Sequence, residues 1–414
     1  MLDVAPARQL VLDHARPKAA VELPSAECLG LTLAEDVASD ADSPPFDRSM
    51  VDGYAIRGTD LSSGGAELTI VEEIMAGAVP RRTVAIGQCA RIMTGAPIPP
   101  GADAVVMHER TELLSDSRVR IRDEKFRPGQ NIMPRAASLR RGQIVLQAGC
   151  EIGPVEMGLL AEVGRARPRV IGPITAAVLS TGNELVPADR VPAEGQIRNS
   201  NGPMLAAALR RCGARPVELG IARDEPDELR RRLAEGLASD LLIISGGVSA
   251  GALDLVPGLL RELGVEEVFH KIRLKPGKPL WFGVRRGEAG SAQKNAAPTL
   301  VFGLPGNPVS SLVCFELFVK LALARLAGRE AIAALAGTSA ELTSEFVHRG
   351  DRPTFHPAVL SHASGQSPSV TPLRWAGSAD LRGLAEANAL AVFPAGDRTF
   401  AAGESLTVLP LGGP

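Results

Sequence analysis

Aromatic side chains are scarce in this chain: they make up 3% of its 414 residues, with two tryptophans and one tyrosine. Base-stacking platforms and aromatic carbohydrate clefts need several exposed rings, so neither is expected. Charge of one sign is not in excess either, because 45 Lys and Arg stand against 47 Asp and Glu. A nucleic-acid surface needs a clustered basic excess, so the balance argues against a nucleic-acid partner. A local basic pocket for a small anion stays open.

The five cysteines are scattered, and none forms a CxxC or a Cys/His pair with the spacing of zinc ligands. This usage is typical of a reduced chain. No apolar run approaches the roughly 18 residues that span a bilayer, and the N-terminus lacks a basic stretch followed by an apolar one. We therefore expect a cytoplasmic protein with no membrane partner. Two common nucleotide-binding motifs, GxxxxGK[ST] and a GxGxxG that follows a strand, are also missing.

Turn residues are abundant, with 43 Gly and 32 Pro. A length of roughly 100–200 residues per domain predicts two to four domains. Residues 5–21 have the apolar spacing of a helix, and the prolines at 44–45 break the chain after it. Short apolar runs between turns over residues 46–136 predict an all-β module. A helical pattern returns within residues 137–169.

From about residue 170 to 328, nearly continuous apolar runs alternate with helical stretches. This pattern predicts a parallel sheet covered by helices on both faces. Residues 329–414 return to short alternating strands and turns. The predicted fold class is therefore α/β multidomain, with a central three-layer parallel-sheet domain, two small β-rich modules and a further N-terminal segment.

Three glycine-containing loops follow predicted strands of this sheet, at residues 181–185, 245–249 and 304–311. The carboxyl ends of parallel strands meet at one edge, where backbone N–H groups and helix N-termini bind anions. One such loop alone is more simply an ordinary strand-to-helix turn. Three at successive strand ends favour a ligand site.

A basic segment, KIRLKPGKP, lies at residues 271–279. Alternation along a strand would put Lys271, Arg273 and Lys275 on one face, and the Pro-Gly turn would bring in Lys278. Cations gathered in this way need an anion or carboxylates nearby. The alternative is a solvated edge strand whose lysines discourage aggregation.

Three acidic residues lie near the same strand ends, namely Glu184, Asp224 and Asp254. Carboxylates beside phosphate-binding lysines indicate Mg²⁺, which proteins hold through one or two carboxylates plus substrate oxygens. Each acid alone is more often a surface charge, and Asp224 could simply cap the helix that follows it.

Seven motifs occur in order along the chain: SPPFDRSMVDGYAIR, ARIMTGAPIPPGADAVVMHE, STGNELV, GQIRNSN, SGGVSAGALD, LKPGKP and GLPGNPVSS. Taken together, they resemble a known family, the molybdopterin molybdenumtransferases, which insert molybdenum during molybdenum cofactor synthesis and include the C-terminal domain of gephyrin. The similarity covers essentially the whole chain.

The resemblance implies an elongated homodimer whose active site lies between the α/β domain of one subunit and the first two domains of its partner. It divides each subunit into four domains: a discontinuous N-terminal α/β domain of residues 1–45 and 137–169, a β-rich domain of 46–136, a molybdopterin-binding α/β domain of 170–328 and a C-terminal β-rich domain of 329–414. Molybdopterin adenylyltransferase and molybdoenzyme clients are the further partners that it suggests.

The implied reaction inserts molybdenum from molybdate into adenylylated molybdopterin, uses Mg²⁺ and releases AMP. Carried over motif by motif, the residues expected to act in catalysis are Asp52, Thr94, Glu184, Asp224, Asp254, Lys271 and Lys275. Those expected to bind the substrates are Ser245, Gly246, Gly247, Ser249, Lys278, Pro305, Asn307, Pro308, Ser310, Arg352 and Ser378. Glu184 and Asp254 are expected to hold the Mg²⁺ ion.

Two other functions compete with this one. The first is a molybdopterin adenylyltransferase, because the central domain shares that ancestry; it would adenylylate molybdopterin from ATP. The second is a non-catalytic paralogue that acts as a dimeric binding scaffold. The acids and lysines of the motifs argue against pure scaffolding, since a scaffold could lose them freely.

Overall fold

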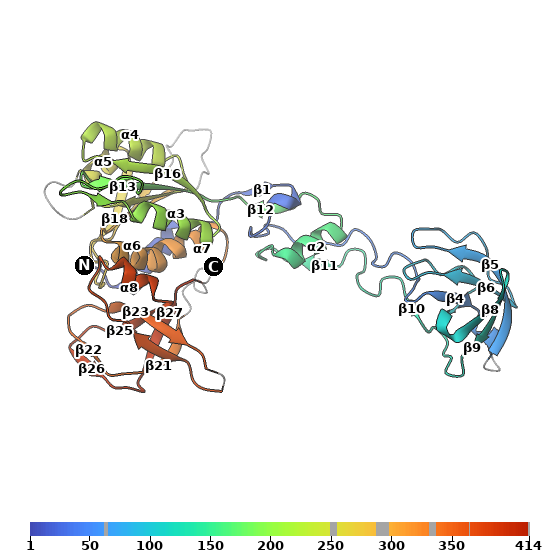
Figure 1. Cartoon of the computed structure of the whole chain (residues 1–414). Helices are drawn as coiled ribbons and strands as arrows, with labels where there is room; N and C mark the ends of the chain where they lie inside the picture. The colour runs from blue at the N-terminus through green and yellow to red at the C-terminus, as the bar shows by residue number, and fades with distance from the viewer. Residues whose placement is uncertain (62–64, 249–254, 287–297, 331–336, 364, 413–414) are drawn as a thin grey trace.

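The computed structural model describes residues 1–414 except 62–64, 249–254, 287–297, 331–336, 364 and 413–414. The molecule is elongated, with a β module at one end, an α/β sheet and a β-barrel at the other, and a narrow connector between them (Figure 1). No helix in the described part of the chain is both long and apolar enough to cross a membrane.

The connector is built from two distant stretches of sequence that pair with each other. Strand β1 (Ala20–Glu22) pairs antiparallel with β12 (Arg169–Ile171), and β2 (Val37–Ala38) pairs with β11 (Ile144–Leu146). Helix α2 (Pro154–Glu162) begins with proline at a helical position that needs no N–H donor. Helix α1 (Val4–His14) packs elsewhere, against the terminal helices of the α/β domain.

The β module is a six-stranded sheet in the order β7-β4-β6-β5-β9-β8. Apolar side chains cover both faces of β4, since Tyr54 and Ile56 pack into one core and Ala55 into another. Strand β3 (Arg48–Ser49) pairs with β10 (Ile132–Met133) where the module joins the connector. The sheet consists of β4 (Gly53–Ile56), β5 (Gly65–Ile74), β6 (Gln88–Ile92), β7 (Ala104–Met107), β8 (Thr111–Ser115) and β9 (Arg118–Arg122).

The central sheet has the order β16-β13-β17-β20-β19-β18. Its first four strands are parallel, as predicted, whereas β19 runs antiparallel to both of its neighbours, β20 and β18. The predicted parallel sheet is therefore confirmed for the strands that the sequence indicated, and the whole sheet is mixed because the loop of residues 271–280 joins β18 to β19 without a crossover helix. The strands are β13 (Thr175–Thr181), β16 (Arg215–Ala222), β17 (Leu241–Ser245), β18 (Val265–His270), β19 (Trp281–Arg285) and β20 (Thr299–Leu304).

Helices cover both faces of this sheet, so the three-layer prediction is confirmed. Alternate residues of β13 enter the two cores: Ala176 and Val178 face one, Ala177 and Leu179 the other. The first face carries α1, α3 (Asn201–Arg211), α6 (Pro308–Cys314) and α7 (Lys320–Leu326), with a π-helical turn over Phe315–Val319; the second carries α4 (Pro226–Gly236) and α5 (Val256–Glu262).

The C-terminal module is a closed barrel in the order β21-β24-β23-β25-β27, which agrees with the predicted small β module. Its core includes the large buried rings of Phe393 and Phe400. Strand β22 (Phe346–His348) pairs with β26 (Arg398–Phe400) beside it, and α8 (Leu381–Ala385) faces α6. The barrel strands are β21 (Thr338–Leu342), β23 (Thr354–Ser361), β24 (Ser369–Pro372), β25 (Ala389–Phe393) and β27 (Ser405–Pro410).

Candidate functional site

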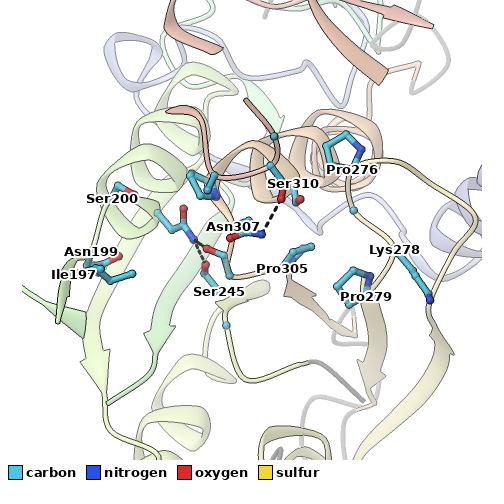
Figure 2. A pocket seen from close by; sticks show the side chains of 18 of the residues that line it. Ile197, Asn199, Ser200, Ser245, Pro276, Lys278, Pro279, Pro305, Asn307 and Ser310 are labelled. Carbon is cyan, nitrogen blue, oxygen red and sulfur yellow. Dashed lines mark hydrogen bonds between the residues drawn. The ribbon is translucent and has the colours of Figure 1, made fainter. Parts of the chain in front are cut away.

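A cavity of about 940 Å³ lies at the carboxyl ends of β13, β17 and β20. All three predicted loops contribute to it, which supports a ligand site over three unrelated turns. In the view of Figure 2, Lys278 and Pro279 lie on one side of the pocket and Asn199 and Ser200 on the other, with Ser245 between them. The predicted residues that line the cavity are Glu184, Ser245, Gly246, Lys275, Lys278, Pro305, Asn307, Pro308, Ser310, Arg352 and Ser378.

Asn201 ties the carboxyl ends of β17 and β20 together, although the sequence pattern does not single it out. Its Nδ2 donates to Ser245 Oγ and to the carbonyl oxygen of Gly306, both at 2.7 Å. Because a carbonyl only accepts, this contact fixes the orientation of the amide and leaves Oδ1 without a donor. Thr181 Oγ1 is also buried and unpaired at the cavity wall. The motif GQIRNSN contains Asn201, but nothing local in it marks the contact.

Gly246 occupies a position that no side chain fits. Its φ is +92°, and an added Cβ would lie 2.5 Å from the carbonyl oxygen of Thr181. We expect Gly246→Ala to lower the free energy of unfolding by about 2–4 kcal/mol, because left-handed backbone and a fixed carbonyl both oppose the methyl group. Denaturant unfolding followed by circular dichroism measures this loss.

The matched control for Gly246→Ala is Gly306→Ala in the facing loop. A Cβ there would meet only the Cα of Gly246, at 4.0 Å. This variant should stay within about 0.5 kcal/mol of wild type, as ordinary surface substitutions do. Equal losses in the two variants would show that the space around Gly246 does not decide the stability of this loop.

The lysine segment differs from its prediction. Strand β18 ends at His270, and Lys271 has a φ of +69°, so residues 271–275 do not form one strand with a common face. The prediction is wrong because the segment binds across to other elements: Lys275 N donates to Pro353 O at 3.0 Å. Lys275 and Lys278 line the cavity, whereas Lys271 is not among the described lining residues.

The barrel supplies one wall of the cavity. Phe355 N donates to Lys275 O at 2.8 Å, so the start of β23 is bridged to the lysine segment. Asn307 Nδ2 donates to Ser378 Oγ at 2.8 Å, a second tie between the α/β loops and the barrel. Through these contacts Arg352 and Ser378 reach a cavity that otherwise belongs to the central sheet.

The predicted acids are not all brought together. Glu184 lines the cavity, and its carboxylate lies against Gly182, where an added Cβ would come within 2.4 Å of Oε2. Asp224 is not a described lining residue; its backbone N donates to Asn183 Oδ1, and the N-cap of α4 is Glu225 instead. Ser249 and Asp254 lie outside the described residues, and Gly247 sits beside Thr181 without lining the cavity.

No group of three or more His, Cys, Asp or Glu side chains able to hold a metal occurs among the described residues. Glu184 and the unpaired hydroxyl of Thr181 nevertheless give the cavity two oxygen donors. Mg²⁺ prefers oxygen ligands and takes few of them from the protein when a phosphate supplies the rest. The described donor set therefore fits Mg²⁺ held jointly with a phosphate-bearing ligand.

Asp52 and Thr94 form a pair in the β module, far from the cavity of the same chain (Figure 1). Asp52 Oδ1 accepts from both the backbone N and the hydroxyl of Thr94, each at 2.7 Å. These two hydrogen bonds, the backbone one first, hold the pKa of Asp52 below its usual range, so the exposed carboxyl is ionised at neutral pH. The pair is thus an exposed anion in the loops beside the paired strands β4 and β6.

Three family models match the chain in succession. They are described as the MoeA N-terminal region (domain I and II) over residues 2–164, a probable molybdopterin binding domain over 177–325 and the MoeA C-terminal region (domain IV) over 339–411. A curated molybdopterin molybdenumtransferase of Bacillus subtilis is 34% identical over 384 residues, which is 91% of this chain and 86% of the relative. The chain belongs to the molybdopterin molybdenumtransferase family.

The chain is also similar to other members of this family, in sequence and in structure. The one from Nostoc is 35% identical and the alignment covers 92% of this chain and 86% of the relative. The crystal structure of a molybdopterin biosynthesis MoeA protein from Pyrococcus horikoshii superposes with a TM-score of 0.81 at 30% identity and covers 99% of each chain. The family resemblance is therefore confirmed. Within this family member, the cavity draws on the second and third matched regions, while the Asp52–Thr94 pair lies in the first.

Proposed function

We propose that this chain transfers molybdenum from molybdate to adenylylated molybdopterin, with release of AMP. The observation that carries the proposal is the cavity, in which Lys275, Lys278 and Arg352 lie with the hydroxyls of Ser310 and Ser378. Molybdate is a tetrahedral dianion, and cationic N–H donors with hydroxyls suit its oxygens. Measuring AMP release from adenylylated molybdopterin with and without molybdate tests the proposal.

Mg²⁺ is part of the proposal. Glu184 and Thr181 would hold the ion from the cavity side, together with Asp254 as the resemblance implies. Bound there, Mg²⁺ would neutralise charge that develops on the phosphoanhydride as it breaks. The residues of the chain then have a separate role, in which Lys275 and Lys278 bind the anionic groups, and the loop around Pro305 and Pro308 presents Ser310 to them.

We further propose that the working unit is a cytoplasmic homodimer with a shared site and with the domain division given above. The Asp52–Thr94 pair is at the far end of the chain from the cavity, yet both belong to the family motifs (Figure 1). A second copy that brings its β module to this cavity would unite them. Asp52 would then be a fixed negative charge facing the cations of the cavity.

The lysine contribution is tested by Lys275→Ala and Lys278→Ala. Both side chains are exposed, and the main-chain bonds that link residue 275 to the barrel survive the substitution. We expect each variant to bind molybdate and AMP about tenfold to a hundredfold more weakly, because a charge-assisted contact contributes about 1.5–3 kcal/mol. Isothermal titration calorimetry measures the affinities.

Arg215→Ala is the matched control for the lysine variants. Arg215 is equally exposed and equally charged, but it begins β16 at the amino end of the sheet, away from the cavity. Its removal should leave both affinities within about twofold of wild type, since screened charges beyond a Debye length contribute little. Lysine variants that behave like Arg215→Ala would support the alternative of a solvated edge.

A further inference from the structure

Trp375 is the one aromatic side chain among the described residues that line the cavity. It lies in the barrel segment that follows β24 and precedes α8. The apolar part of the cavity is otherwise supplied mainly by prolines, such as Pro276 and Pro305, and by aliphatic side chains. Proline rings have no π face, so among the described lining residues Trp375 is the side chain that offers an aromatic face to a ligand.

Trp375 packs against a ring of the barrel strand β23. The ring of His356 meets the indole edge to face, with centroids 5.4 Å apart and an interplanar angle of 86°. His356 is itself fixed, because its Nε2 must donate to the Leu373 carbonyl at 2.9 Å and its ring contacts Phe346 at 4.9 Å. Burial lowers the pKa of His356, so this support is neutral at neutral pH.

The loop that follows Trp375 in the sequence is held by Asp380. Asp380 accepts from Ala376 N and from Gly383 N, both at 3.0 Å, which closes residues 376–380 onto the helix. The indole Nε1 is buried and has no hydrogen-bond partner among the described residues. A buried tryptophan N–H usually donates a hydrogen bond, so the Nε1–H of Trp375 is a donor that lacks its usual acceptor among the described residues.

We infer that Trp375 stacks against a planar ring of the substrate and thereby selects for it. The inference rests on the proposed function, because that substrate carries an adenine and a pterin, each of which contains a flat conjugated ring. Stacking of one such ring on an aromatic side chain is sensitive to the loss of the aromatic face and tolerant of a change from one aromatic residue to another. Trp375 is thus a specificity residue and takes no part in bond breaking.

The first test measures KM and kcat for adenylylated molybdopterin in the AMP-release assay. Trp375→Leu should raise KM about tenfold, and up to a hundredfold, while kcat stays within about threefold, because stacking binds ground and transition states alike. Trp375→Phe keeps a π face and should stay within about threefold of wild type in both constants. An unchanged KM in Trp375→Leu would overturn the inference.

The second test uses tryptophan emission, with AMP and pterin-6-carboxylate as separate probes. The chain has two tryptophans, and the other one, Trp281, is 1% exposed in the sheet, where its Nε1 donates to Glu267 at 3.0 Å. The probe whose ring stacks should quench the tryptophan emission of the wild-type protein. It should leave the emission of the Trp375→Phe variant unchanged. Quenching that persists in Trp375→Phe, or none with either probe, would contradict stacking at Trp375.

The two tests separate this inference from the proposed function. A wild-type protein that releases AMP and a Trp375→Leu variant with the same KM refute only the role of Trp375. A wild-type protein that releases no AMP refutes the proposed function, and the emission titrations then still decide whether a planar ring binds at Trp375.

Discussion

An equal mixture of two inactive variants, Asp52→Asn and Glu184→Gln, should recover about a quarter of wild-type activity per site after subunit exchange. In a shared-site dimer, each cleft combines the β module of one subunit with the cavity of the other. The mixed dimer therefore has one cleft with both lesions and one with neither. About half of the dimers are mixed after random exchange, and half of their clefts are intact, which gives the quarter.

Each variant alone should lose at least about a hundredfold in AMP release, because a charge at the reacting groups is removed without a change of shape. The matched control mixes Asp52→Asn with Thr94→Val. Both lesions then lie in the β module, so no cleft in the mixed dimer is intact. Recovery in the first mixture and none in the second requires a site built from two subunits; no recovery in either, with exchange verified by mass spectrometry, rules out the shared site.

Gly53→Ala should unfold the β module selectively, with a loss of about 3 kcal/mol or more. Strand β4 lies between β6 and β7, and the backbone at Gly53 approaches β7 so closely that an added Cβ would be 1.9 Å from Val106 O. Val106 O belongs to the backbone of β7, which is paired with β4, so it cannot move aside as a flexible side chain does. Hydrogen exchange measured by mass spectrometry should show faster exchange in β4 and β7, with the central sheet unchanged.

Gly158→Ala provides the contrasting case. Gly158 lies within α2, where an added Cβ meets nothing within 4 Å. Alanine should stabilise this helix by about 0.5–1 kcal/mol, since glycine loses more backbone entropy when it becomes helical. The prediction for Gly53→Ala fails if β4 and β7 are equally protected from hydrogen exchange in this variant and in wild type. That result would mean that the two strands have room to separate.

The order of elements could be predicted because it rests on local periodicity. The apolar runs ending at Ser180, Ile244 and Gly303 mark buried parallel strands, and the loops after them reach one cavity as expected. The reversed direction of β19, the strand next to the edge, could not be predicted in this way. The pattern of β19 is as apolar as that of its parallel neighbours, and strand direction depends on a loop whose path is set by distant contacts.

The side chains of the site were predicted less completely, because their positions also depend on contacts with distant parts of the chain. Lys271 and Lys275 have the alternation of a strand, but the barrel pairs with residue 275 and the chain turns left-handed at Lys271. Asn201 and Trp375 carry no local signal at all, because their roles depend on partners about 45 to 105 residues away or on the docking of the barrel. Arg352 and Ser378 were accessible only through the family resemblance.

Molybdate-dependent AMP release from purified adenylylated molybdopterin tests the central claim most directly. With Mg²⁺ present, wild-type protein should release AMP together with molybdenum insertion, and release should fall to background when molybdate is left out. AMP release at one rate with and without molybdate, or formation of adenylylated molybdopterin from ATP by this chain, would contradict the claim that it is the molybdenum-inserting enzyme.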